Sequence, residues 1–247
     1  MVTLRRKFFV FPIYDNWFGA KKGIWNSLYF NSYLHVPDDL KNPLLIRKDN
    51  HTVELDLSRN NEEIFEGFAR TVKAQVKQCE RDGLQSYFDQ DIDKFIAFFN
   101  PFAEQKGIPK VTRKMMEEFG PMLRISYAEQ DGTILAAHTH LFDAEEKIVR
   151  QMHSASLRFD QGFDKNKIGR ANKFLHYRDM LAFKEQGILY YDFGGYFKQD
   201  TTEEITSLLN FKLDFGAYKK LSYNYFTLSY HLTRKMMKSF GLIGAKY

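Results

Sequence analysis

Residues 187–195 read Gly-Ile-Leu-Tyr-Tyr-Asp-Phe-Gly-Gly. The short apolar run at 188–193, bounded by glycines, predicts a buried strand. Gly187 predicts the end of a preceding helix, because glycine readily adopts the left-handed conformation that closes many helices. Asp192 lies at the end of the strand, where open α/β sheets usually bind their ligands. Asp192 is therefore a candidate site residue that either orients a bound acceptor or fixes the Gly194–Gly195 backbone.

The segments around this strand predict a regular succession of elements. Apolar spacing predicts helices at 168–186 and 203–213 and a last strand at 223–230. The upstream elements follow in order: a strand at 52–57, a helix from about residue 60 to Gly83, a strand at 84–88, helices at 92–106 and 112–119, and three antiparallel strands at 123–127, 134–142 and 148–157. Asp131-Gly132 predicts a tight hairpin turn between the first two of these three strands. The first fifty residues are rich in aromatic side chains and predict little beyond a strand at the start.

From residue 83 onward, the order is strand, two helices, three antiparallel strands, helix, strand, helix and strand. This order resembles that of the GNAT acyltransferases. We therefore predict an α/β fold of the α+β kind, with a GNAT-like mixed, largely antiparallel sheet flanked by helices. We expect a reduced N-terminal GNAT-like piece at residues 1–82 and a GNAT-like acyltransferase domain at residues 83–247.

Composition excludes several classes of protein. With 44% hydrophobic and 27% charged residues, the 247-residue chain can bury a substantial core, so we exclude disorder and a disulfide-stabilised miniprotein. Its one cysteine, Cys79, excludes an internal disulfide and a cysteine-cluster metal site. It lies on the apolar side of the helix that ends at Gly83, so we predict a core residue and not a nucleophile. No uncharged apolar stretch approaches the roughly 20 residues of a membrane-spanning helix.

The stretch Asn166-Lys-Ile-Gly-Arg-Ala171 predicts an anion-binding helix start. Small residues at Gly169 and Ala171 let a phosphate approach the backbone, and unpaired amides at a helix N-terminus favour negative charge. The pattern resembles the GNAT pyrophosphate loop, with Asn166 in place of the usual first residue. An alternative is that the two small residues only allow close packing of the helix on the sheet. The candidate donor-binding residues are Asn166, Lys167, Ile168, Gly169, Arg170 and Ala171.

A second resemblance covers roughly residues 50–230. The segment 169–176, the Tyr-Asp-Phe-Gly strand end and the segment Phe211-Lys-Leu-Asp-Phe-Gly216 are similar to the C-terminal region of the Fem family, the peptidoglycan-bridge aminoacyltransferases. The resemblance implies that Lys212 places a cation near the reacting carbonyl or the donor phosphates. The alternative is a lysine at a helix end whose stem lies along the surface. Many Fem enzymes have two full GNAT-like halves, whereas this chain has room for one and a reduced piece.

Further candidates come from the antiparallel strands. His138 and His140 are two residues apart on one strand, so their side chains share a face, and either is a candidate base for an amine. No third ligand at a telling spacing accompanies them, so we predict no metal. Ser156 and Arg158 occupy alternate positions in the strand that leads to the helix start, and they are candidates for substrate binding. An exposed face or an ion pair is the alternative for each of these residues.

We therefore expect an enzyme, an N-acyltransferase that moves an acyl group from acyl-CoA, such as acetyl-CoA, to an amine. The resemblance implies an amino sugar or another cell-envelope precursor as the acceptor. One alternative is an aminoacyl-tRNA-dependent transferase of the Fem type, for which the basic stripe Arg70, Lys73, Lys77 and Arg81 is the first surface to test. Another is a non-catalytic binding module. The net charge of +5 favours anionic partners, and the cysteine usage favours the cytoplasm.

Overall fold

The computed structural model describes residues 1–8, 11–20, 26, 29–196 and 202–239. The chain divides into two compact units. The central unit comprises residues 52–219, and the terminal unit comprises residues 1–51 and 220–247. The division falls within strands β4 (Leu45–Asp56) and β10 (Tyr218–Thr227), so each of these strands contributes residues to both units.

The central unit contains a mixed sheet in the order β4-β9-β8-β7-β6-β5. The pairs are antiparallel except for β8 and β9, which run parallel. The remaining strands of this sheet are β5 (Gln85–Phe88), β6 (Leu123–Gln130), β7 (Thr133–Asp143), β8 (Ile148–Ser156) and β9 (Tyr190–Gly195). The predicted class, a mixed and largely antiparallel sheet, is confirmed.

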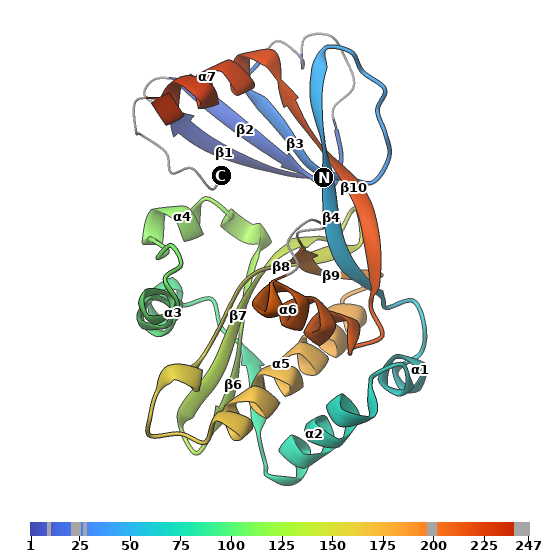
Figure 1. Ribbon diagram of the computed structural model, residues 1–247, viewed down its shortest axis with the longest axis vertical. Helices are drawn as coiled ribbons and strands as arrows, with labels where there is room; N and C mark the ends of the chain where they lie inside the picture. The colour runs from blue at the N-terminus through green and yellow to red at the C-terminus, as the bar shows by residue number, and fades with distance from the viewer. Residues whose placement is uncertain (9–10, 21–25, 27–28, 197–201, 240–247) are drawn as a thin grey trace. The chain divides into compact units, whose positions relative to one another are not determined.

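Helices cover both faces of this sheet (Figure 1). Helix α5 (Lys165–Glu185) packs on β6 and β7, and α3 (Ile92–Lys106) packs on β7 and β8 from the opposite side. The alternation along β7 explains the two layers, because His138 and His140 face α5 while Thr139 bonds to His153, whose ring contacts Phe95 and Phe99 of α3. The other helices of the unit are α1 (Asn61–Glu66), α2 (Arg70–Arg81), α4 (Arg113–Glu117), α6 (Glu203–Leu213) and the short 3₁₀ helices η2 (Gly120–Met122) and η3 (Leu157–Phe159).

Several local predictions are confirmed by cap and turn geometry. Asp91 caps α3 by accepting a hydrogen bond from the Lys94 amide, and Gly107 ends this helix with φ of 68°. The β6–β7 hairpin turns at Asp131 and Gly132, whose φ angles of 50° and 75° fit a primed turn. Cys79 is buried in the core of the central unit, as predicted, and burial raises the pKa of its thiol to about 11. A thiol with that pKa is protonated at neutral pH and is a weak nucleophile.

Three predicted elements differ from the structure. The single helix expected before Gly83 is two helices, α1 and α2, because Asn60 caps the first helix and Gly67 ends it. The last strand ends at Thr227, three residues earlier than expected, and α7 (Leu228–Ser239) follows it. Helix α5 begins at Lys165, three residues before the expected start, because Asp164 acts as its N-cap. Propensity patterns place element centres better than their ends, which depend on such caps.

The division into units also differs from the predicted boundary at residues 82–83, which lies inside the central unit between α2 and β5. The physical reason is packing: β4 pairs with β9, and α2 packs on α5. Residues 52–82 therefore share the core of the segment that follows them.

The terminal unit contains β1 (Val2–Phe8), β2 (Phe11–Trp17) and β3 (Asn31–Val36), together with residues of β4 and β10 and helix α7. Strand β1 confirms the strand predicted at the start of the chain. Strand β2 is antiparallel to β1 and parallel to β3, and β3 is antiparallel to β10. Two contacts of the buried Asp15 carboxylate stabilise this sheet. The carboxylate accepts a hydrogen bond from Ser32 and lies 3.1 Å from the Arg6 guanidinium. None of the helices that the structure describes is long and apolar enough to cross a membrane.

Candidate functional site

Asp192 is the centre of a buried polar group at the end of β9. Its carboxylate has no exposed surface and accepts hydrogen bonds from Thr52 of β4, from the Gly194 amide at 2.7 Å and from Arg150 of β8 at 2.5 Å. The register of the sheet explains the arrangement, because Arg150 pairs with Asp192 across the parallel strands β8 and β9. Asp192 thus fixes the Gly194 backbone, which is one of the two roles considered for it.

Lys212 of α6 contacts the glycine turn that Asp192 fixes. Its Nζ donates hydrogen bonds to the carbonyl oxygens of Gly194 at 3.1 Å and Gly195 at 2.8 Å. The side chain is only 7% exposed, and burial lowers the pKa of Lys212 to about 8, against the opposing effect of Asp192. The stem of Lys212 does not lie along the surface, which was the alternative considered for it. An ammonium group at this position is still the major form at neutral pH.

Gly194 needs to be glycine at this turn. Its φ of 87° is in the region that side-chain-bearing residues rarely adopt, and a Cβ there would lie 3.6 Å from the Gln151 carbonyl and 4.0 Å from the Lys212 Nζ. The turn therefore leaves room for the lysine between β9 and α6.

This arrangement is suited to stabilising negative charge. An ammonium group has three N–H donors, and two of those of Lys212 are held by the glycine carbonyls. The third N–H has no partner among the residues that the structure describes. A fixed donor of this kind in a buried setting favours an oxyanion more strongly than the same group in water.

A groove lies between α5 and α6 of the central unit. Its volume is about 610 Å³. Its lining residues are Lys173, Glu203, Thr206, Ser207, Asn210, Phe211 and Asp214. Lys173 donates to Gln75 at 2.7 Å, and burial lowers the pKa of Lys173. Phe211 precedes Lys212, so the groove and the lysine share one helix.

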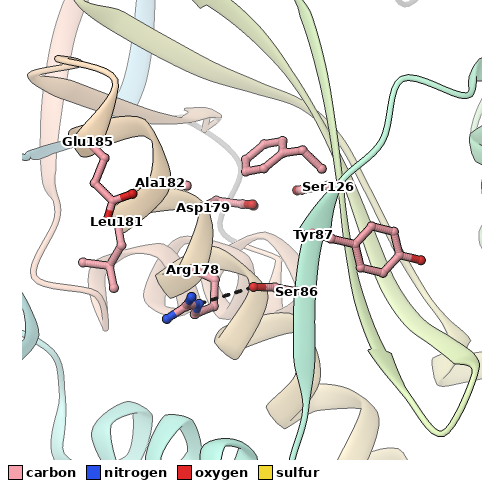
Figure 2. Close-up of a pocket in the computed structure, with 9 residues that line it drawn as sticks. Ser86, Tyr87, Ser126, Arg178, Asp179, Leu181, Ala182 and Glu185 are labelled. Atoms are coloured by element: carbon pink, nitrogen blue, oxygen red, sulfur yellow. Dashed lines mark hydrogen bonds between the residues drawn. The ribbon is translucent and has the colours of Figure 1, made fainter.

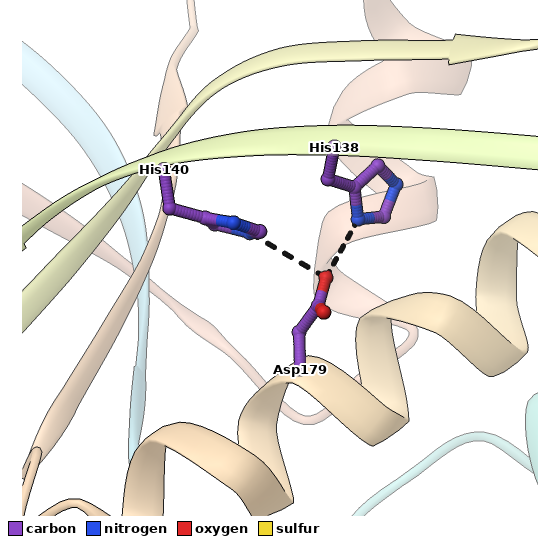
Figure 3. Close-up of side chains that lie close together, drawn as sticks. All are labelled: His138, His140 and Asp179. Atoms are coloured by element: carbon purple, nitrogen blue, oxygen red, sulfur yellow. Dashed lines mark hydrogen bonds and ion pairs between the residues drawn. The ribbon is translucent and has the colours of Figure 1, made fainter. Parts of the chain in front are cut away.

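The two strand histidines share a face of β7 as predicted, but the structure places them inside the core (Figure 3). The Nδ1 atom of His138 lies 2.8 Å from Asp179 Oδ2, and its Nε2 atom lies 3.0 Å from Asn172 Oδ1. The Nε2 atom of His140 lies 3.1 Å from the Tyr191 hydroxyl. Burial, together with the nearby His138, lowers the pKa of His140 well below its usual range. Neither histidine has exposed surface, so a role as base stays a prediction.

The predicted anion-binding residues lie in the first turns of α5. The Asp164 carboxylate accepts from the Asn166 amide at the helix start, and the Ile168 amide bonds to the Asp164 carbonyl. In an α-helix that begins at Lys165, the Gly169 amide pairs with the carbonyl four residues back. The free amides expected around Gly169 are therefore used by the helix itself, because the helix starts earlier than predicted.

The side chains of the same stretch divide between core and solvent. Ile168 and Ala171 are fully buried, Asn166 and Gly169 are exposed, and Lys167 and Arg170 are partly exposed. A Cβ at Gly169 would meet no atom within 4 Å, so close packing on the sheet does not require this glycine. Binding of an anion here stays a prediction.

Ser156 and Arg158 do not share a strand. Ser156 ends β8, whereas Arg158 lies in η3 and is exposed, with its guanidinium 5.7 Å from the centre of the Phe159 ring. The alternation expected at 148–157 stops at Ser156, because the chain turns into the 3₁₀ helix.

Sequence reasoning missed Arg150, Thr52 and Asp179. A charged residue inside an apolar strand is a signal for Arg150, and a carboxylate between Leu175 and Met180 on the buried face of α5 is a signal for Asp179. Thr52 carries no such signal, since a threonine is common in a strand.

No protein-family model matches this sequence, and no curated protein matches it. Among solved structures, FemX matches with a TM-score of 0.63 at 12% identity, over 94% of this chain and 85% of the FemX chain. L-PGS from Bacillus licheniformis matches with a TM-score of 0.59 at 12% identity, over 99% of this chain and 86% of that chain.

A third similar structure is the C-terminal domain of an Agrobacterium fabrum protein assigned as a lysylphosphatidylglycerol synthetase. Its TM-score is 0.55 at 12% identity, over 88% of this chain and 73% of that chain. At such low identity these likenesses concern the fold and not the activity. The chain therefore has the Fem-like fold that its sequence resemblance predicts, shared with FemX and with L-PGS.

Proposed function

We propose that this protein is an acyltransferase that moves an acyl group to an amine, and that the donor is an aminoacyl-tRNA. The observation that carries the proposal is the buried ammonium of Lys212, held against the Gly194 and Gly195 carbonyls beside the Arg150–Asp192 pair. A fixed cation in a buried site is what the developing oxyanion of acyl transfer requires.

The reaction proceeds by direct attack. The amine nitrogen attacks the ester carbonyl carbon of the donor, and the negative charge that develops on the carbonyl oxygen is stabilised by the third N–H of Lys212. The bond between this carbon and the ribose oxygen of the tRNA then breaks, and the proton lost by the amine ends on that oxygen. The proposal assigns no step to His138 or His140, because neither side chain reaches the surface.

Two observations support aminoacyl-tRNA as the donor. FemX and L-PGS are among the similar solved structures, and the Fem family, which the sequence resembles, consists of aminoacyltransferases. In addition, the carboxylate of Asp164 accepts from the Asn166 amide at the start of α5, and its negative charge weakens this helix start as a site for the diphosphate of CoA. This chain also spans 85% of the FemX chain, so its length no longer argues against a tRNA-dependent enzyme.

Acyl-CoA is the second candidate donor. The groove of about 610 Å³ between α5 and α6 favours acyl-CoA, because Phe211, the residue before Lys212, lines this groove. The acceptor that we propose is an amino sugar or another cell-envelope precursor with a primary amine, used in the cytoplasm.

The donor can be identified by binding. We expect the full-length protein to bind labelled aminoacyl-tRNA with an affinity that falls steeply as salt rises, and acetyl-CoA to leave the melting temperature unchanged. A raised melting temperature with acetyl-CoA and no tRNA binding would instead support the second candidate. Binding of neither ligand contradicts both and leaves a non-catalytic module.

The role of Lys212 can be tested by transfer of the label to a panel of amino sugars and muropeptide precursors. We expect Lys212→Met to lower kcat/KM at least about 100-fold, the typical loss when one oxyanion donor is removed. Lys184→Met is the matched control, since Lys184 also donates to two backbone carbonyls, those of Leu57 and Arg59. Equal turnover in wild type and Lys212→Met would remove Lys212 from the mechanism.

A further inference from the structure

Three buried side chains bring metal-binding atoms together between β7 and α5 (Figure 3). His138 Nδ1, His140 Nε2 and Asp179 Oδ2 all lie within 4.8 Å of one another, and none of the three side chains is more than 1% exposed. Asp179 Oδ2 is 2.8 Å from His138 Nδ1 and 3.5 Å from His140 Nε2. Tetrahedral ligands placed about 2.0–2.1 Å from a Zn²⁺ ion are about 3.4 Å apart, so small side-chain shifts would bring these atoms onto one ion.

The hydrogen bonds of His138 point to a cation in the same place. Its Nε2 faces Asn172 Oδ1, an oxygen that also accepts a hydrogen bond from Ser154, and its Nδ1 faces the Asp179 carboxylate. A neutral imidazole has one N–H and can donate to only one of these oxygens. With Nε2 as the donor to Asn172, Nδ1 presents its lone pair towards Asp179 and can bind a metal ion shared with this carboxylate; with Nδ1 as the donor, His138 bonds to Asp179 directly. A ligand histidine whose other nitrogen donates to an oxygen is the usual arrangement at metal sites.

A candidate for the fourth ligand lies next to His140 Nε2. The Tyr191 hydroxyl lies 3.1 Å from His140 Nε2 and 3.1 Å from His176 Nδ1. Both groups are fully buried. The Tyr191 hydroxyl, which is next to His140 Nε2, can complete a four-coordinate site with the two imidazoles and the carboxylate.

One of the three residues, Asp179, also lies in the wall of a small pocket (Figure 2). The pocket has a volume of about 140 Å³ and is lined by residues of β5 and α5 and by Ser126 of β6. Arg178, also in the wall, donates a hydrogen bond to Ser86. The pocket is therefore next to the Asp179 residue.

We propose that His138, His140 and Asp179 bind one Zn²⁺ ion that joins β7 to α5. Two imidazoles with one carboxylate form a ligand set that suits Zn²⁺, and a site enclosed by a sheet and a helix is of the structural kind. None of the three ligand residues contacts Lys212 through a hydrogen bond, and the proposal does not depend on the proposed acyl transfer. A metal-free network, in which His138 bonds directly to Asp179, is the outcome that would replace it.

Metal content tests the proposal directly. The untagged full-length protein is expressed with added ZnSO₄ and desalted, and its zinc content is measured by plasma mass spectrometry. We expect about one Zn²⁺ per chain in the wild type and less than a tenth of that in Asp179→Asn and His140→Gln. His153→Gln is the matched control and should keep the metal, because His153 is a partly buried histidine whose ring packs on Phe99 of α3 instead.

A measurement on the wild type alone covers the case in which the variants fail to fold. Refolding with Co²⁺ should produce the visible absorption of a four-coordinate ion, and zinc X-ray absorption should show two imidazoles at about 2.0–2.1 Å. Wild-type protein that carries no zinc and gives no such Co²⁺ spectrum overturns the proposal. Equal zinc in wild type and Asp179→Asn overturns it as well, since the ion would then be bound elsewhere.

Discussion

Lys212 combines burial with charge. Removal from water disfavours its ammonium form, which lowers its pKa to about 8 from the usual lysine value of 10.5. The two glycine carbonyls and the Asp192 carboxylate offset part of this cost. Hydrogen bonds and packing hold the side chain in this position. Burial of its charge lowers the stability of the fold, which supports the proposed role of Lys212 in acyl transfer.

This cost predicts how stability depends on pH. Between about pH 8 and pH 10.5, the unfolded chain keeps a proton on Lys212 that the folded chain has lost, so the free energy of unfolding rises with pH. Relative to Lys212→Met, we expect the wild type to gain on the order of 2–3 kcal/mol across this window. Urea denaturation of both proteins at several pH values measures the difference. A difference that stays constant from pH 7.5 to pH 10.5 would contradict the lowered pKa.

At the scale of elements, the break between α1 and α2 packs against the turn that follows α6. The Ala69 amide donates to the Asp214 carbonyl at 2.7 Å, and Gly216, with φ of 70°, lies directly against Gly67. A Cβ at Gly216 would be 2.6 Å from the Gly67 carbonyl oxygen. Two glycines far apart in the chain therefore permit one close backbone contact, which orients α6 and its Lys212.

We expect Gly216→Ala to destabilise the protein more than Gly187→Ala. Both positions have positive φ, which costs about 1–2 kcal/mol for alanine. A Cβ at Gly187 meets no atom within 4 Å, whereas at Gly216 the backbone must shift, at a further cost of about 1–3 kcal/mol. Thermal unfolding of the two variants measures the difference. Equal melting temperatures would show that the loops separate without cost.

For the whole molecule, the net charge of +5 favours a polyanionic partner. Arg70, Lys77 and Arg81 of α2 are exposed at helical spacing, and Lys73 is paired with Glu66. Helix α2 packs on α5, so this stripe belongs to the same unit as Lys212. A surface of this kind is the usual means of attracting a phosphate backbone.

Neutralising the stripe tests its part in tRNA binding. With Arg70, Lys77 and Arg81 all changed to Gln, we expect weaker binding and a log–log salt slope that is shallower by about two to three. The matched control changes Lys106, Lys110 and Lys114 to Gln, which removes the same charge from exposed positions of the α3–α4 region. Identical slopes for the two triple variants would assign the effect to net charge and not to the stripe.

The sequence by itself determined the order and type of most elements of the central unit. The apolar spacing of α3 and α5, the Asp131-Gly132 turn and the full range of α6 follow from local chemistry that a short window contains. The family resemblance also singled out Lys212, and the position at a strand end singled out Asp192. Element ends such as the start of α5 and the break at Gly67 were missed, because single caps and contacts decide them.

Only the tertiary structure decided which side chains meet. Arg150 lies beside Asp192 because β8 and β9 are parallel in one register, and Asp179 joins His138 because α5 packs on that face of β7. These partners are about 40 residues apart in the chain, with separations of 42 and 41 positions. No local pattern records such a contact, since it depends on sheet register and helix packing that form only when the whole core assembles.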